Sequence, residues 1–103
     1  MKRRREYPWS VTLFGGADMG LVDFVEQIRD RHDFQRFLLL LRQDFIENGH
    51  GWENDTLESF LGGMEGFVGD MDGFYKNRGE NVDLSNPSWK VMAHALLAAR
   101  VYE

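Results

Sequence analysis

Apolar side chains recur at helical spacing along most of the chain, and most regularly in residues 57–75. Asp55 or Thr56 is the expected N-cap of a helix there, and Gly79 suits its end because glycine tolerates the left-handed conformation. The pattern predicts one long helix. Nine positions follow the i, i+3, i+4, i+7 spacing of a single helix face: Leu57, Phe60, Leu61, Met64, Phe67, Val68, Met71, Phe74 and Tyr75.

Two shorter patterns precede the long helix. Residues 21–30 carry one apolar face and predict a short helix. Residues 34–48 carry a broader apolar stripe, which predicts a central helix with Asp33 as its N-cap. Asn48-Gly49 is expected to end this helix, with Gly49 in the left-handed conformation.

A last helix is predicted to begin at Asn86-Pro87, because proline's missing N–H costs nothing at the first helical position. Ser85 or Asn86 is its expected cap. The fold class is therefore mainly α, a compact four-helix orthogonal or bundle-like domain over residues 20–103. Residues 1–19 are predicted to be an irregular N-terminal arm. Within it, alternation over residues 9–14 favours either a short strand or an extended segment packed on the helices.

Glycines are the unusual feature of the long helix, because each costs a helix about 1 kcal/mol relative to alanine. Four share one stripe and a fifth lies beside it: Gly62, Gly66, Gly69 and Gly73, with Gly63. The sequence leaves three explanations open. Another part of the chain packs closely, the helix breaks near Gly62-Gly63, or a partner helix uses the stripe as a groove.

The charge of the 103-residue chain is −5, and it is unevenly distributed. Residues 2–5 are all basic, and we interpret them as a solvated tail. Without them the chain holds 8 basic and 17 acidic residues, a net charge of −9. An acidic body repels nucleic acid and attracts a basic protein. We therefore expect a protein partner and no nucleic acid.

Other features bear on location and chemistry. No apolar run approaches the roughly 20 residues of a membrane span, and the absence of cysteine suits a reducing cytoplasm. Asp70 and Asp72 resemble the start of a calcium loop, but Phe74 and Tyr75 stand where that loop needs an oxygen ligand and a glycine. The three histidines lack the i, i+4 spacing of a helical zinc site. We expect a cytoplasmic protein that is not an enzyme and has no cofactor or metal.

Acidic side chains beside aromatic ones define two candidate contact segments, residues 52–55 and 70–80. Trp and Tyr often anchor protein interfaces. Trp52 is better explained as a plug at the end of the helical domain. The predicted partner-binding residues are Glu53, Asp55, Asp70, Asp72, Tyr75 and Glu80.

Several short motifs in residues 41–103 resemble an uncharacterised family of small bacterial helical domains. They are Leu41-Arg42 with Asp44, Trp52-Glu53-Asn54, Thr56-Leu57-Glu58 with Phe60-Leu61, Asp70-Met71-Asp72-Gly73-Phe74-Tyr75 with Asn77 and Gly79, Pro87-Ser88-Trp89, and Leu96-Leu97-Ala98-Ala99-Arg100 with Tyr102-Glu103. The resemblance implies no particular activity, and residues 1–19 lie outside it.

In size and acidity the chain is also similar to bacterial immunity proteins, which bind and block a cognate toxin. We therefore expect a bacterial protein-binding domain of the immunity or antitoxin type, whose acidic surface covers a basic toxin. The alternative is a structural or regulatory module that self-associates through the glycine stripe.

Overall fold

The computed structural model describes residues 19–103, which form four α-helices and one 3-10 turn. The helices are α2 (Met19–Glu26), α3 (Arg31–Asn48), α4 (Leu57–Asn77) and α5 (Trp89–Ala99), and the turn is η2 (Gly49–Gly51). The predicted mainly α fold with four helices is confirmed, and no strand occurs within residues 19–103. The candidate strand at residues 9–14 lies outside the described residues.

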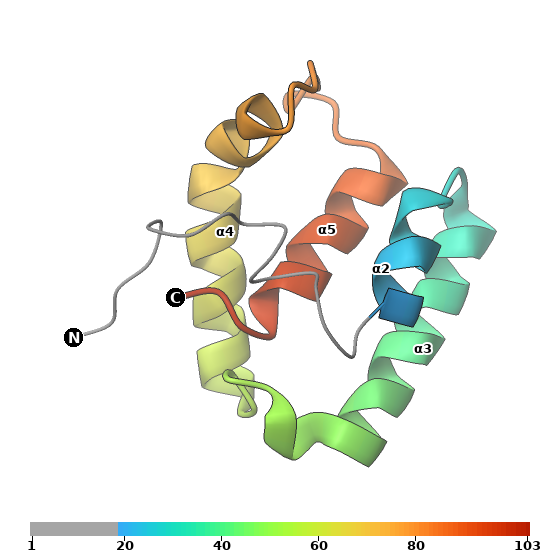
Figure 1. The fold of residues 1–103 in the computed structure, drawn as a ribbon, viewed down its shortest axis with the longest axis vertical. Helices are drawn as coiled ribbons and strands as arrows, with labels where there is room; N and C mark the ends of the chain where they lie inside the picture. Colours follow the sequence, from blue (N-terminus) through green and yellow to red (C-terminus); the bar gives the residue numbers. More distant parts are fainter. Residues whose placement is uncertain (1–18) are drawn as a thin grey trace.

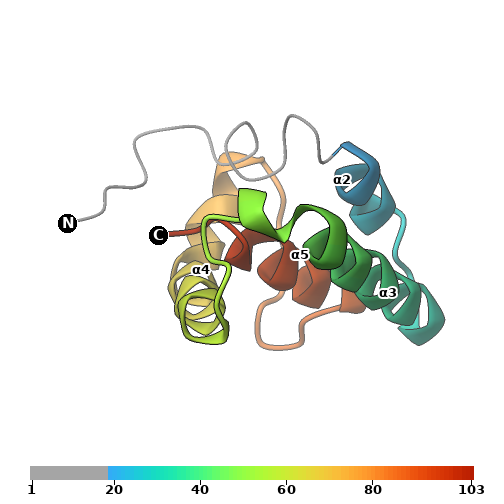
Figure 2. The same ribbon diagram turned by 90° about the horizontal axis from the view of Figure 1, so that it is seen from below.

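α5 is the central helix of the fold. α3 and α4 lie on either side of it, and α2 packs on α3 and α5 from one side of this three-helix layer (Figure 1, Figure 2). α5 presents small, fully buried side chains at positions 93, 98 and 99, which allow its neighbours to approach closely. The apolar side chains between the helices form one core, whose fully buried members include Val25, Phe37, Phe67 and Phe74.

α3 begins one turn earlier than its apolar stripe predicts. Asp30 is the N-cap, because its carboxylate accepts the Asp33 N–H at 2.9 Å. The predicted cap, Asp33, is wrong: it lies in the first turn and accepts the Arg29 N–H at 3.0 Å. α2 ends at Glu26, short of the predicted residue 30, since the chain must turn before Asp30 can cap α3.

The end of α3 also differs from the prediction. The chain passes from Asn48 directly into η2, so Gly49 keeps a right-handed φ of −60° and the predicted left-handed end is wrong. Glycine is needed there for a different reason. A β-carbon at Gly49 would lie 2.6 Å from the Phe45 ring.

α4 is one continuous helix through all of its glycines. Thr56 is its N-cap, as predicted, and forms a reciprocal capping box with Ser59. The Thr56 hydroxyl accepts the Ser59 N–H at 3.1 Å, and the Ser59 hydroxyl accepts the Thr56 N–H at 3.2 Å. The chain leaves the helix through Gly79, the predicted end residue, which has a left-handed φ of 73°.

α5 begins later than predicted. Its N-cap is Ser88, whose hydroxyl accepts the Val91 N–H at 3.2 Å. The first helical residue is Trp89, so the predicted start at Asn86-Pro87 is wrong by two residues. A serine one position after the proline provides the cap, and the proline lies in the preceding connection.

Two of the α4 glycines are explained by close packing of the chain's own C-terminal segment. A β-carbon at Gly63 would lie 2.7 Å from the Ala99 carbonyl oxygen and 2.6 Å from the Asn54 amide nitrogen. At Gly66 it would lie 3.2 Å from the Tyr102 ring. The remaining three, Gly62, Gly69 and Gly73, have no neighbouring atom within 4 Å of that position, and packing does not explain them.

These contacts predict opposite effects for alanine at two glycines of the same helix. Gly63→Ala should lower the free energy of unfolding by about 2 kcal/mol, because backbone must move to admit the methyl group. Gly69→Ala should raise it by about 0.5–1 kcal/mol, because that site is open and alanine is the better helix former. Urea denaturation measures both. Equal stabilisation by the two variants would contradict the packing at Gly63.

Candidate functional site

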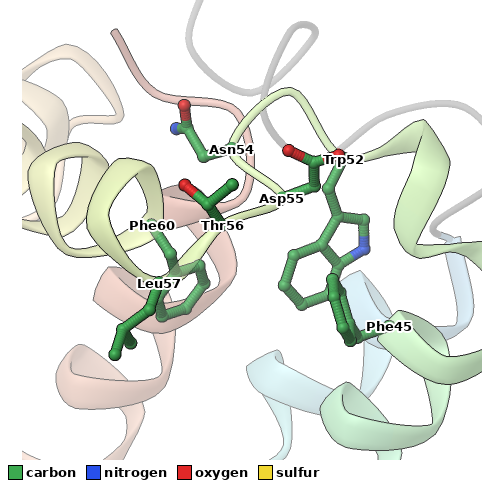
Figure 3. Close-up of a pocket in the computed structure, with 7 residues that line it drawn as sticks. All are labelled: Phe45, Trp52, Asn54, Asp55, Thr56, Leu57 and Phe60. Atoms are coloured by element: carbon green, nitrogen blue, oxygen red, sulfur yellow. The ribbon is translucent and has the colours of Figure 1, made fainter.

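The predicted contact residues fall into two groups near opposite ends of α4. Asp55 lines a hollow of about 250 Å³ between the end of α3 and the start of α4, and Glu53 is exposed in the preceding connection. Figure 3 shows Trp52 and Phe45 on one side of this hollow and Leu57 and Phe60 on the other. Its lining is therefore mainly apolar, with an acidic residue at its edge.

The second group surrounds the other end of α4. Asp72, Tyr75 and Glu80 line one hollow of about 450 Å³, together with residues of the connection to α5. Asp72 and Glu80 are exposed, and Glu80 pairs with Arg78 at 2.9 Å. The structure thus brings three of the six predicted residues together, about 30 Å of helix away from Asp55.

Tyr75 belongs to the interior despite lining this hollow. Its side chain is 3% exposed, and its hydroxyl lies 2.7 Å from His94 Nδ1. His94 Nε2 lies 2.9 Å from the Glu26 carboxylate on α2. Because a carboxylate only accepts, we infer that Nε2 donates to Glu26 and Nδ1 accepts the tyrosine proton. The Tyr75 hydroxyl is therefore part of a hydrogen-bonded network that connects α4, α5 and α2.

Burial sets the protonation of this buried network. It lowers the pKa of His94, and the hydrogen bond to Glu26 only partly opposes that effect. It also raises the pKa of Tyr75 well above its ordinary value. Burial alone would raise the pKa of Glu26, but the contacts with His94, Arg78 and Lys90 lower it. At neutral pH the arrangement is a neutral tyrosine and imidazole with an ionised glutamate, and a tyrosine held in this way is a weak nucleophile.

Several residues of the sequence motifs hold the C-terminal segment in place. The Asn54 side chain is buried, and its amide donates to the carbonyl oxygens of Ala99 and Tyr102, both at 2.9 Å. The Tyr102 hydroxyl donates to the half-buried Asp70. Asp70 therefore has an internal partner and is not part of the exposed acidic surface.

Trp52 closes the end of the helical layer. Its indole packs between the rings of Phe45 and Phe60, at centroid distances of 5.0 and 5.7 Å. Its N–H donates to Asp44 at 2.8 Å, and the buried Arg100 guanidinium lies 3.6 Å from the same carboxylate. The interpretation of Trp52 as a plug fits these contacts.

Sequence patterns did not reveal one feature of the surface of residues 19–103, a group of exposed apolar side chains on α3, α4 and α5. On α3, Leu38 and Phe45 lie on the flank opposite Leu40, which borders a hollow shared with α2. On α4, Leu57, Leu61 and Val68 lie on the flank opposite Gly66 and Asp70, which the C-terminal segment covers. These two flanks and the outer side of α5 form one surface, which we name the apolar face. Its residues are Phe34, Leu38, Phe45, Leu57, Leu61, Met64, Val68, Trp89, Met92 and Leu96.

Ring contacts connect the three helices across the apolar face. Phe34 of α3 lies 5.3 Å from Trp89 of α5 at one end. Phe45, Trp52 and Phe60 link α3 to α4 at the other end. The apolar side chains of the three helices therefore form one surface, on the side of the layer away from α2.

Charged residues of opposite sign border the apolar face. Beside the stripe of α4 lie Glu58, Glu65 and Asp72, which we name the acidic edge. Beside the stripe of α3 lie Arg31 and Arg42, which we name the basic edge. All five side chains are exposed. An apolar centre with charged edges is the usual composition of a protein interface.

Residues 19–103 contain no cluster of three or more metal-binding side chains, and no helix long and apolar enough to cross a membrane. Asp70 and Asp72, which resemble the start of a calcium loop in the sequence, lie on a regular helix. Asp70 accepts a hydrogen bond from the Tyr102 hydroxyl there.

The fold and these contacts define a small all-helical domain whose motif residues largely serve its packing. The chain belongs to the family of unknown function DUF7660, whose model matches residues 30–103. The match covers α3, α4 and α5 and begins after α2. It confirms the resemblance to an uncharacterised family. No curated protein and no solved structure matches the chain.

The His94 network predicts a pH-dependent stability. Because the folded pKa of His94 lies below the ordinary value of 6.5, unfolding takes up a proton at lower pH. The free energy of unfolding should be level above pH 6.5 and fall below it, by up to about 1.4 kcal/mol per pH unit. The lowered pKa of Glu26 adds a further loss below pH 4.5.

Denaturant titrations at pH 7.5, 6.5 and 5.5 measure this dependence. His94→Gln, which keeps a donor for Glu26, should be less stable at neutral pH but should lose the slope below pH 6.5. His50→Gln, at an exposed histidine, is the control and should retain the slope. If the slope vanished in the His50 variant and persisted in the His94 variant, the assignment to His94 would be wrong.

Proposed function

We propose that this protein is a bacterial protein-binding domain of the immunity or antitoxin type, which acts in the cytoplasm and blocks a basic partner by stoichiometric binding. The observation that carries the proposal is the acidic edge of α4 beside exposed apolar side chains. Glu58, Glu65 and Asp72 follow at intervals of seven residues and form a line of about 20 Å.

Three more exposed acids, all predicted contact residues, extend this line at both ends. Glu53 and Asp55 precede α4, and Glu80 follows Asp72 around the second hollow. A basic partner surface would be attracted to such a line, which favours fast association. Asp70 and Tyr75 support the same surface from within, because their side chains are bound to Tyr102 and His94.

The apolar stripe of α4 gives a bound partner something to bury. Leu57, Leu61 and Val68 lie next to the acidic edge and are at least half exposed. Burial of apolar side chains supplies most of the affinity of an interface, while charged edges supply orientation and association rate. A small acidic domain with both features suits an inhibitor that covers a basic site.

Charge reversal tests the proposal on candidate partners, the basic proteins encoded beside the gene. Asp55→Lys with Asp72→Lys should weaken binding by about tenfold, mainly through slower association, and should flatten its dependence on salt. Asp23→Lys, an exposed acid of α2 away from α4, is the matched control and should bind like the natural chain. Surface plasmon resonance at two salt concentrations gives the rates.

Two outcomes would sink the proposal. One is that no neighbouring basic protein binds. The other is that Asp23→Lys weakens binding as much as the α4 variants, because attraction would then reflect net charge alone. Asp70 is left unchanged in this test, since its contact with Tyr102 would mix stability with binding.

A further inference from the structure

Residues 19–103 leave the apolar face uncovered, with many of its side chains exposed. Its seven exposed members, which are Leu38, Phe45, Leu57, Leu61, Val68, Trp89 and Met92, retain between 38% and 75% of their accessible surface. Monomeric proteins rarely leave so many large apolar side chains on one surface, and such patches usually mark a contact. α2 covers only the opposite side of the three-helix layer.

The two charged edges indicate what covers this face. The edge on α4 is acidic, through Glu58, Glu65 and Asp72, and the edge on α3 is basic, through Arg31 and Arg42. A uniformly basic partner would satisfy the first edge and be repelled by the second. A partner that fits both must carry the opposite arrangement, with basic residues over α4 and acidic residues over α3.

A second copy of this chain carries that arrangement. Consider a two-fold axis that lies in the plane of the apolar face and runs along α5. Rotation about this axis exchanges the two edges, so α4 of one copy lies over α3 of the other. We infer that two copies associate through the apolar face, with Arg31 and Arg42 of each copy against the acidic edge of the other. Trp89 and Met92 of α5, the helix between the two edges, are exposed within this contact.

The face is large enough for a stable dimer. The helical layer lies in the plane of the molecule's two longest dimensions, 36 and 34 Å. A standard interface needs about 800 Å² from each partner. The glycine stripe is a poorer candidate, because Tyr102 of the same chain already covers Gly66.

Sedimentation equilibrium of the full chain tests the inference without any partner. The natural chain should show twice the mass of one copy at micromolar concentration. Leu61→Asp on α4 and Met92→Asp on α5 should each raise the dissociation constant at least tenfold. Leu40→Asp is the control, because Leu40 is 36% exposed on the opposite flank of α3, beside the hollow shared with α2, and should leave the dimer intact. Circular dichroism checks that each variant is folded.

Charge exchange tests the pairing of the edges. Glu65→Arg alone and Arg42→Glu alone should each weaken the dimer, because each places like charges across the axis. The double variant carries both changes in both copies and should recover the natural dissociation constant. A double variant that is weaker than either single one would overturn the inference.

Two further results would also overturn it. One is a monomer at all concentrations, which would leave the face to a different protein or to residues 1–18. The other is a dimer that survives Leu61→Asp and is lost in Leu40→Asp. The inference does not depend on the proposed function, since the dimer is measured in the absence of a partner. If the dimer and the proposed function are both correct, the second copy and the partner compete for α4. Dimerisation then weakens partner binding, and partner binding weakens dimerisation, by mass action.

Discussion

The Asn54 side chain makes the contact on which the arrangement of α4 and α5 depends. Its amide donates to the carbonyl oxygens of Ala99 and Tyr102, and its own N–H donates to the Arg100 carbonyl at 2.8 Å. Two of these acceptors, the Ala99 and Arg100 carbonyls, lie at the end of α5, where they lack helical partners and would be costly to bury without a donor. The same amide lies over Gly63, where a side chain would displace it. One asparagine thus ends α5, orients the C-terminal segment and requires glycine in the middle of a helix.

The middle of α5 is held by the Tyr75, His94 and Glu26 network. It connects the C-terminal half of α4 to α2 through an imidazole on α5. α5 is therefore fixed by polar contacts at its middle and at its C-terminal end, and by apolar packing along its length. Buried polar groups cost stability when a partner is missing, so such a network specifies one arrangement of helices more strongly than apolar contacts alone.

Sequence patterns predicted the four helices because their apolar spacing is regular, and they predicted Thr56 and Gly79 because those residues act through local geometry. They misplaced the caps at Asp33 and at Asn86-Pro87, where neighbouring residues of the same type compete. They could not separate Asp70 from Asp72, which differ only in whether a distant tyrosine reaches them. The spacing of apolar residues does not distinguish buried from exposed positions on a broad stripe. The exposed flanks of α3 and α4 were therefore not predicted.

The exposed face follows from how few helical layers residues 19–103 provide. A helical layer usually needs cover on each side that carries apolar residues. α2 has only eight residues and covers one side. Charged residues on the uncovered stripe of α4 would avoid the exposure of apolar side chains. Leu57, Leu61 and Val68 are nevertheless apolar beside a line of acids. Apolar residues retained at such a surface are most simply explained by a second surface that buries them, whether from another copy or another protein.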